Sequence, residues 1–119
     1  MKASEIAYKA AEIMSERGHC KDRLEDKNGA VCHQGAVLLA FHSAVRLTPE
    51  GRTLFGWSLS DAEKAQLDEI NVTGARILEA MGDNNHLGVV SFNNNLRTSG
   101  EDVILLLKES GRILEEEGC

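Results

Sequence analysis

Apolar residues recur at steps of three and four along several stretches of the chain, which is the spacing that predicts amphipathic helices. The first stretch has a face made of Ile6, Ala10, Ile13 and Met14. Ser4 is its expected N-cap, because a short hydroxyl side chain can accept a hydrogen bond from a free amide at a helix start. Gly18 is its expected stop, so the helix should end near Arg17.

Residues 30–45 form the second stretch, which contains no charged side chain and is apolar on nearly every side. Such a helix needs neighbours around most of its surface, and it is too short for a bilayer, which takes about 20 apolar residues. We therefore expect a buried central helix within a bundle. A charged surface loop over residues 19–29 should precede it, and an aromatic connector containing Trp57 should follow and cover the core.

Two later stretches carry helix-start signals. Ser60 and Glu63 have the spacing of a capping box, and a third helix should run from there to Gly82. Its apolar positions include Leu67, Ile70, Ile77, Leu78 and Met81. Gly74 lies among them, where a close helix crossing would offset the cost of about 1 kcal/mol for glycine in a helix.

Thr98 and Glu101 repeat the capping-box spacing before a last helix. The apolar face of that helix is predicted to hold Val103, Leu106, Leu107, Ser110 and Leu114. Its last turn should fray, because the glutamates at 115–117 lie at the negative end of the helix dipole.

A short apolar run, residues 87–92, lies between two polar clusters at 83–86 and 93–95. The run predicts either one extended segment or a buried connector, and the asparagines at 93–95 are typical of a turn. The complete pattern predicts an all-α fold: a single domain over residues 1–119, built as a small bundle of about four helices with a short extended segment before the last helix.

Composition excludes several functional classes. The 119 residues carry 13 basic and 19 acidic side chains, so the net charge of −6 repels phosphate backbones and argues against nucleic-acid binding. The N-terminal stretch has the charge pattern of an amphipathic helix rather than a signal peptide. Three cysteines at unmatched spacings favour a reducing compartment over a disulfide framework. We therefore expect a cytoplasmic protein that does not enter a membrane.

Cys32 is the first candidate for chemistry, because the opening turn of a helix favours a thiolate. A thiol enzyme would also need a base, for which His33, His42 and His86 are candidates, and an orienting group such as Asn93 or Asn94. The simpler interpretation is that Cys32 fills the core. Cys20 and Cys119 are then expected to be the more accessible thiols.

The sequence also contains candidate metal and ligand sites. The adjacent pairs His19-Cys20 and Cys32-His33 could supply four zinc ligands, but structural zinc sites normally place paired ligands two to four residues apart. We expect no metal and no cofactor. The polar clusters at 83–86 and 93–95 could instead line a small-ligand pocket, with His86, Asn93, Asn94 and Trp57 as the candidate binding residues.

Two stretches carry a family resemblance: residues 32–37 (CHQGAV) after Asn28-Gly29, and 92–94 (FNN) followed by Arg97-Thr98 and residues 101–103 (EDV). They resemble the signatures of a family of uncharacterised small proteins from actinobacteria and their bacteriophages. Members tend to carry Asp where this chain has Asn94. The resemblance implies a shared helical fold and a phage or actinobacterial setting, and it implies no reaction.

The sequence thus favours a small, acidic, non-enzymatic accessory protein of phage type that binds another protein, either a host protein or a second copy of itself. If it is phage-encoded, the host cytoplasm is its expected location. Two alternatives stay open. One is a small-ligand binder that uses the loops around His86 and Asn93, and the other is a thiol-dependent enzyme with Cys32 as nucleophile and His86 as base.

Overall fold

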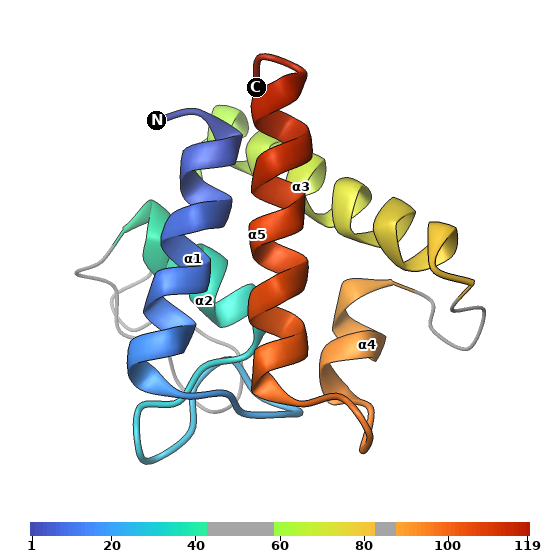
Figure 1. The fold of residues 1–119 in the computed structure, drawn as a ribbon. Coiled ribbons are helices and arrows are strands. Elements are labelled where there is room, and N and C mark those ends of the chain that lie inside the picture. Colours follow the sequence, from blue (N-terminus) through green and yellow to red (C-terminus); the bar gives the residue numbers. More distant parts are fainter. Residues whose placement is uncertain (43–58, 83–87) are drawn as a thin grey trace.

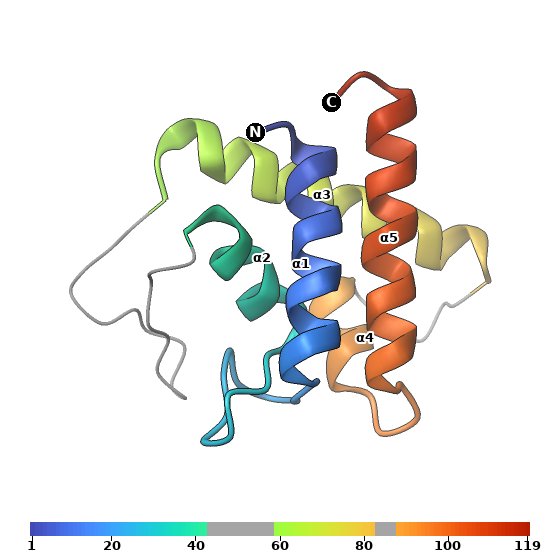
Figure 2. The same ribbon diagram turned by 60° about the vertical axis from the view of Figure 1, so that its left-hand side comes forward.

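The computed structural model describes residues 1–42, 59–82 and 88–119, and this part of the chain is all-α, as predicted. Figures 1 and 2 show its five helices: α1 (Ala3–Arg17), α2 (His33–Phe41), α3 (Asp61–Ala80), α4 (Val89–Asn94) and α5 (Gly100–Glu116). The expected connector with Trp57 and the polar cluster with His86 lie outside the described residues.

Helices α1 and α5 lie side by side and antiparallel, so that both ends of the chain are at the same end of the molecule (Figure 1). Small residues make this close approach possible: Ala7, Ala10 and Ala11 of α1 are buried, and a Cβ at Gly111 of α5 would lie 3.0 Å from the ring of Tyr8. The pair forms one wall of the core, which α2 and α3 complete.

The start of α1 differs from the prediction. Its N-cap is Lys2, and the Glu5 carboxylate accepts a hydrogen bond from the Lys2 backbone N–H at 2.9 Å. Ser4 is 2% exposed within the first turn, and its backbone N–H donates to the Cys119 carbonyl at 3.1 Å. The predicted stop is confirmed, since α1 ends at Arg17 and Gly18 follows with a φ of 91°.

Helix α2 is central but shorter than the 30–45 stretch, since it begins at His33 and ends at Phe41. Val31 remains extended because its backbone pairs with the loop: its N–H donates to the Gly18 carbonyl, and its carbonyl accepts from Cys20. Most of α2 is buried, as expected. The preceding loop is not wholly on the surface, because Cys20 within it is only 8% exposed.

Helix α3 begins with the predicted capping box between Ser60 and Glu63. The expected close crossing at Gly74 is present, and the partner is α4: a Cβ at Gly74 would lie 2.6 Å from Cγ1 of Val89. Met81, the last residue of the apolar spacing, is the C-cap of α3 and is 72% exposed.

From residue 89 on, the apolar run before the last helix is itself helical. Helix α4 spans Val89–Asn94, so residues 89–92 do not form the expected extended segment, residues 93–94 are helical rather than a turn, and Asn95 is the C-cap. Val89 and Asn93 are one turn apart and are both buried. Contacts of this single face with α2, α3 and α5 explain why the segment adopts a helix.

Helix α5 starts one residue later than predicted. Ser99 and Asp102 form the capping box, whereas Thr98 is buried. All five predicted face residues of α5 are buried. The predicted fraying is wrong, because the helix continues to Glu116 and Arg112 pairs with that residue and with Glu109.

Backbone hydrogen bonds fix the segment after α5. The Cys119 N–H donates to the Leu114 carbonyl at 2.8 Å, and Cys119 packs against the core. None of the described helices has the length and apolar composition needed to cross a membrane.

Candidate functional site

Asn93 is the centre of a buried polar junction near the end of α4. It is 1% exposed. Its Oδ1 accepts from the His33 backbone N–H at 3.0 Å and from His19 Nε2 at 2.9 Å. Its Nδ2 donates to the Cys20 carbonyl at 3.2 Å and to Asn94 Oδ1 at 2.9 Å. These four bonds use the full capacity of the amide, so the geometry favours a structural role for Asn93 over ligand binding.

Neighbouring residues extend the junction to the loop after α1. Asn94 Oδ1 also accepts from the Asp22 backbone N–H at 2.9 Å, and Lys21 Nζ donates to the Asn95 carbonyl. The two stretches that carry the family resemblance, 32–37 and 92–94, therefore meet in space. Their meeting point holds the loop, the start of α2 and the end of α4 together.

Gln34 links α2 to α3 through a reciprocal amide pair. Its Nε2 donates to Asn71 Oδ1 at 2.8 Å, and Asn71 Nδ2 donates back to Gln34 Oε1 at 3.3 Å. The same Gln34 Nε2 lies 2.9 Å from His33 Nδ1. Because an amide N–H donates there, His33 Nδ1 is the acceptor and the ring proton of the neutral imidazole is on Nε2.

His33 is 1% exposed, and its Nε2 has no hydrogen-bond partner in the described part of the chain. Burial disfavours the charged imidazolium and lowers the pKa of His33 from 6.5 to about 4. The ring is therefore neutral at pH 7 and becomes protonated only under acidic conditions. Its burial couples the protonation of the ring to the stability of the fold.

Stability should fall between pH 6.5 and pH 4 because of His33. The imidazole binds a proton more readily in the unfolded chain, since its pKa is about 4 in the folded protein and 6.5 as a free group. The corresponding contribution to the free energy of unfolding is fully present above pH 6.5. It is lost as the pH falls toward 4, and the total loss is about 3 kcal/mol. Urea unfolding at several pH values should show this slope, and His33→Gln should remove it. If His33→Gln kept the same slope, the assignment to His33 would be wrong. His42→Gln, which removes an exposed imidazole, is the control.

Cys32 does not have the ionisation that its position at a helix start predicted. It is the N-cap of α2, and its Sγ accepts from the Gly35 backbone N–H at 3.3 Å. Burial nevertheless raises the pKa of the thiol, because the loss of solvation exceeds the effect of the backbone hydrogen bonds. Cys32 is thus a capping thiol and not a thiolate at neutral pH.

Cys20 is also buried, which corrects its expected accessibility. Burial, together with a smaller effect of the nearby Cys32, raises the pKa of this thiol to about 11. Its Sγ donates to the Arg23 carbonyl at 3.3 Å. Cys119 is half-buried, so it is the most accessible of the three cysteines.

Iodoacetamide at pH 7.5 should therefore alkylate Cys119 first. Cys20 and Cys32 should react much more slowly, because a buried, protonated thiol is a poor nucleophile. Peptide mass spectrometry of one sample, taken at several times, gives all three rates. The same experiment in urea is the control, since unfolding should make the rates similar. Fastest labelling at Cys32 in the folded protein would instead support the thiol-enzyme alternative.

No group of three or more His, Cys, Asp or Glu side chains in residues 1–42, 59–82 and 88–119 is arranged to hold a metal ion. The four zinc-ligand candidates have other roles in this structure. His19 bonds Asn93, Cys20 donates to the Arg23 carbonyl, Cys32 caps α2, and His33 is buried beside Gln34. Of the candidate binding residues, Asn93 and Asn94 belong to the junction, while His86 and Trp57 lie outside the described ranges.

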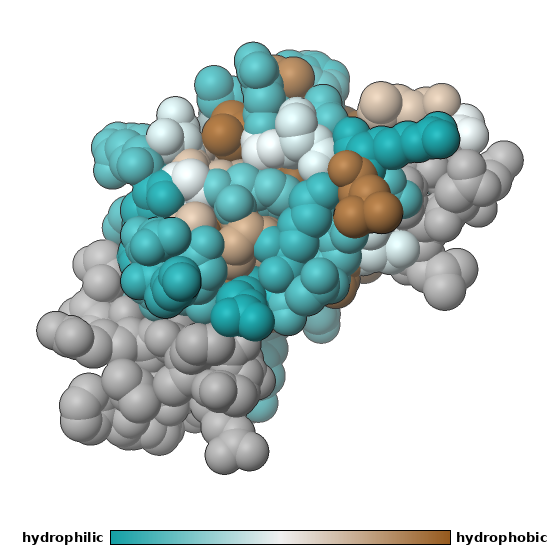
Figure 3. Space-filling model, turned by 90° about the horizontal axis from the view of Figure 1, so that it is seen from below, coloured by the Kyte–Doolittle hydropathy of each residue, from teal (hydrophilic) through white to brown (hydrophobic). Residues whose placement is uncertain are grey.

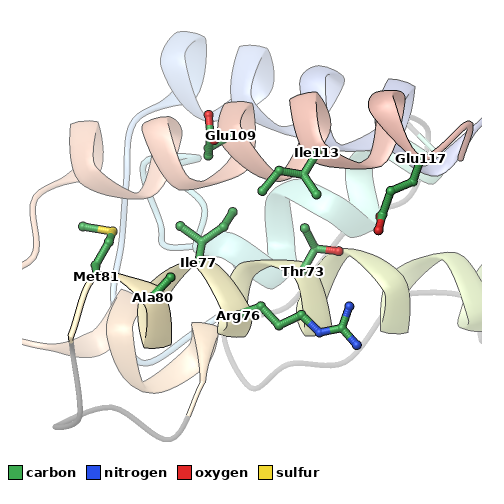
Figure 4. Close-up of a pocket in the computed structure, with 8 residues that line it drawn as sticks. All are labelled: Thr73, Arg76, Ile77, Ala80, Met81, Glu109, Ile113 and Glu117. Carbon is green, nitrogen blue, oxygen red and sulfur yellow. The ribbon is translucent and has the colours of Figure 1, made fainter.

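A groove between α3 and α5 is the second feature of interest (Figure 4). It has a volume of about 410 Å³. Figure 4 shows Ile113 of α5 facing Ile77 and Thr73 of α3. The residues that line the groove are Thr73, Arg76, Ile77, Ala80, Met81, Glu109, Ile113 and Glu117. Its floor is therefore apolar, with charged side chains on both rims.

The groove could not be recognised from helical periodicity alone. Ile77 and Met81 follow the same spacing as the core residues Ile70 and Leu78, but they are rotated toward α5 and solvent. The available signal was the width of the apolar stripe, because Ile77, Leu78, Ala80 and Met81 cover more of the helix circumference than one buried face requires.

One protein-family model, described as a family of unknown function (DUF6197), matches residues 1–112. The match includes both stretches that meet at Asn93. Comparison with curated proteins and with solved structures gives no match.

Proposed function

We propose that this chain, which belongs to the family of unknown function DUF6197, is a protein-binding module that docks its partner in the groove between α3 and α5. The observation that carries the proposal is the apolar floor of that groove, formed by Ile77, Ala80, Met81 and Ile113 on the surface of the molecule. Grooves of this kind accept the apolar face of a partner helix.

Other parts of the molecule support a binding role over catalysis. The polar groups of Asn93 are used within the chain, and the thiol of Cys32 has a raised pKa. The described part of the end seen in Figure 3 is mainly hydrophilic, with apolar side chains in separate groups, so it offers less apolar surface for docking. The groove is thus the best candidate interface.

The proposal includes a setting. An acidic protein of this size is suited to act as an accessory factor of an actinobacterium or its phage, in the cytoplasm of the host cell. The partner is then a host protein or a second copy of this chain. A net charge of −6 favours a protein partner over a nucleic acid.

An uncharged amphipathic peptide tests the groove directly. The probe is a stapled helix of leucine and glutamine, titrated into isotopically labelled protein and followed by amide chemical shifts. We expect saturable shifts confined to residues of α3 and α5 that line the groove. Ala80→Trp should abolish binding, because Ala80 is an exposed lining residue and an indole there would occupy the floor.

Ala65→Trp is the matched control, since Ala65 is also exposed on α3 but does not line the groove. It should bind the peptide as the wild type does. Shifts that map to another surface, or binding that survives Ala80→Trp, would contradict the proposal. Analytical ultracentrifugation of the wild type and Ala80→Trp distinguishes a second copy of the chain from a different partner.

A further inference from the structure

The groove continues past Thr73 and Arg76 into a second hollow of about 280 Å³, near the end of α5. Both hollows include Thr73, Arg76 and Glu117 in their linings, so they lie next to each other, and together they are called the channel below. The second hollow adds Asp68, Glu69, Val72, Leu114 and Cys119. Its floor is also partly apolar, because Val72 is 48% exposed there.

Charge is distributed unequally along this channel. Three exposed acidic side chains surround the second hollow: Asp68, Glu69 and Glu117. Among the described residues, Arg76 is the one basic side chain in the linings, and it lines both hollows. Glu109 lies at the other end and bonds Arg112. One end of the channel is therefore acidic, while the end at Ile77 and Met81 is mainly apolar.

The backbone of α5 strengthens the acidic end. Glu117 is the C-cap of α5, and the last carbonyls of a helix carry about half a negative charge in addition to any side chains. The acidic end thus combines three carboxylates and a helix C-terminus with one basic side chain, Arg76, so its net charge is negative. A binding segment with negative charge would be repelled there, and one with Lys or Arg would be attracted.

We infer that the partner segment is a basic amphipathic helix, with leucine-like residues over Ile77 and Met81 and Lys or Arg side chains beside Asp68 and Glu69. This inference rests on the proposed docking function of the groove. From Asp68 to Ala80 helix α3 rises about 18 Å, at 1.5 Å per residue. A partner helix that follows the channel therefore needs about 12 residues, with its basic side chains two to three turns from its apolar ones.

Three stapled peptides of equal length separate the partner chemistry from the docking function. Each carries the same leucine stripe at one end, and the other end carries Lys, Gln or Glu. At low ionic strength we expect the Lys peptide to bind at least tenfold more tightly than the Glu peptide, with the Gln peptide between them. The difference should shrink as salt is added, because the rim charges are exposed to solvent.

Reversing the charge at the acidic end tests where the preference arises. Asp68→Lys combined with Glu69→Lys should weaken the Lys peptide about tenfold and leave the Gln peptide unchanged. Glu12→Lys combined with Glu16→Lys on α1 changes the net charge equally, outside the residues that line the channel, and should keep the wild-type preference.

The outcomes distinguish the two proposals. If the Gln peptide binds in the groove and the Lys peptide binds no more tightly, the basic partner is overturned and the docking function stands. The basic partner is also overturned if the preference for the Lys peptide survives the charge reversal at 68 and 69. The same holds if the α1 control variant loses this preference to the same extent. Failure of the Gln peptide to bind in the groove overturns the docking function itself.

Discussion

Replacing Asn93 with leucine is expected to lower the free energy of unfolding by about 3–5 kcal/mol. The substitution keeps the approximate volume but removes all four hydrogen bonds, and it leaves the His33 N–H and the Cys20 carbonyl without their partner. Each buried polar group left in this way costs about 1–3 kcal/mol. Because small domains have a total stability of about 5–15 kcal/mol, the variant should be only marginally folded.

Urea unfolding followed by circular dichroism measures this loss. Asn28→Leu is the control, since Asn28 is exposed in the loop before α2, and its effect should be within about 0.5 kcal/mol. Asn93→Asp should be intermediate in stability, because it keeps an acceptor for the His33 N–H but cannot donate to Cys20. A loss below about 1 kcal/mol for Asn93→Leu would show that the junction does not hold the fold together.

Gly35→Ala is expected to cost about 3 kcal/mol or more. A Cβ at this position would lie 2.1 Å from the carbonyl oxygen of Leu24, which is backbone and already accepts from the Cys32 N–H at 3.1 Å. Overpacking alone typically costs 1–3 kcal/mol, and moving Leu24 away would also break this hydrogen bond. Thermal and urea unfolding should both show the loss.

Gly74→Ala provides a matched comparison within another helix. Its Cβ would meet the side chain of Val89 at 2.6 Å, and a side chain can adjust more easily than a backbone carbonyl. Alanine also favours the helix by about 1 kcal/mol, so the net loss should be below about 2 kcal/mol. If Gly74→Ala lowered the stability more than Gly35→Ala, the contact between the Leu24 carbonyl and α2 would not be what requires glycine at position 35.

Local signals in the sequence determined the three long helices. Apolar spacing and end signals act over three or four residues, so the face of α5 and the capping box at Ser60 could be identified without the fold. The one-residue shift at α5 has the same origin, because Thr98/Glu101 and Ser99/Asp102 have equal spacing. Only the tertiary position of Thr98, which is buried, decides between the two pairs.

The two short helices depended on tertiary contacts. Helix α2 has 9 residues and α4 has 6, and helices of this length are unstable in isolation because nucleation is costly. Their ends are joined by the hydrogen bond from the His33 N–H to Asn93, across 60 positions of sequence. No local pattern encodes such a contact, which explains why residues 87–92 were expected to be a strand or connector.

For the candidate sites, the sequence alone identified residue types and approximate positions. It placed Cys32 correctly at the start of a helix, and it identified Asn93 and Asn94 as a polar cluster near an apolar run. Burial then decided their chemistry, because desolvation raises the pKa of Cys32 and the folded chain satisfies the Asn93 amide. The groove between α3 and α5 likewise exists only once two helices pack together, since residues with the same helical spacing become core or surface according to which neighbour covers them.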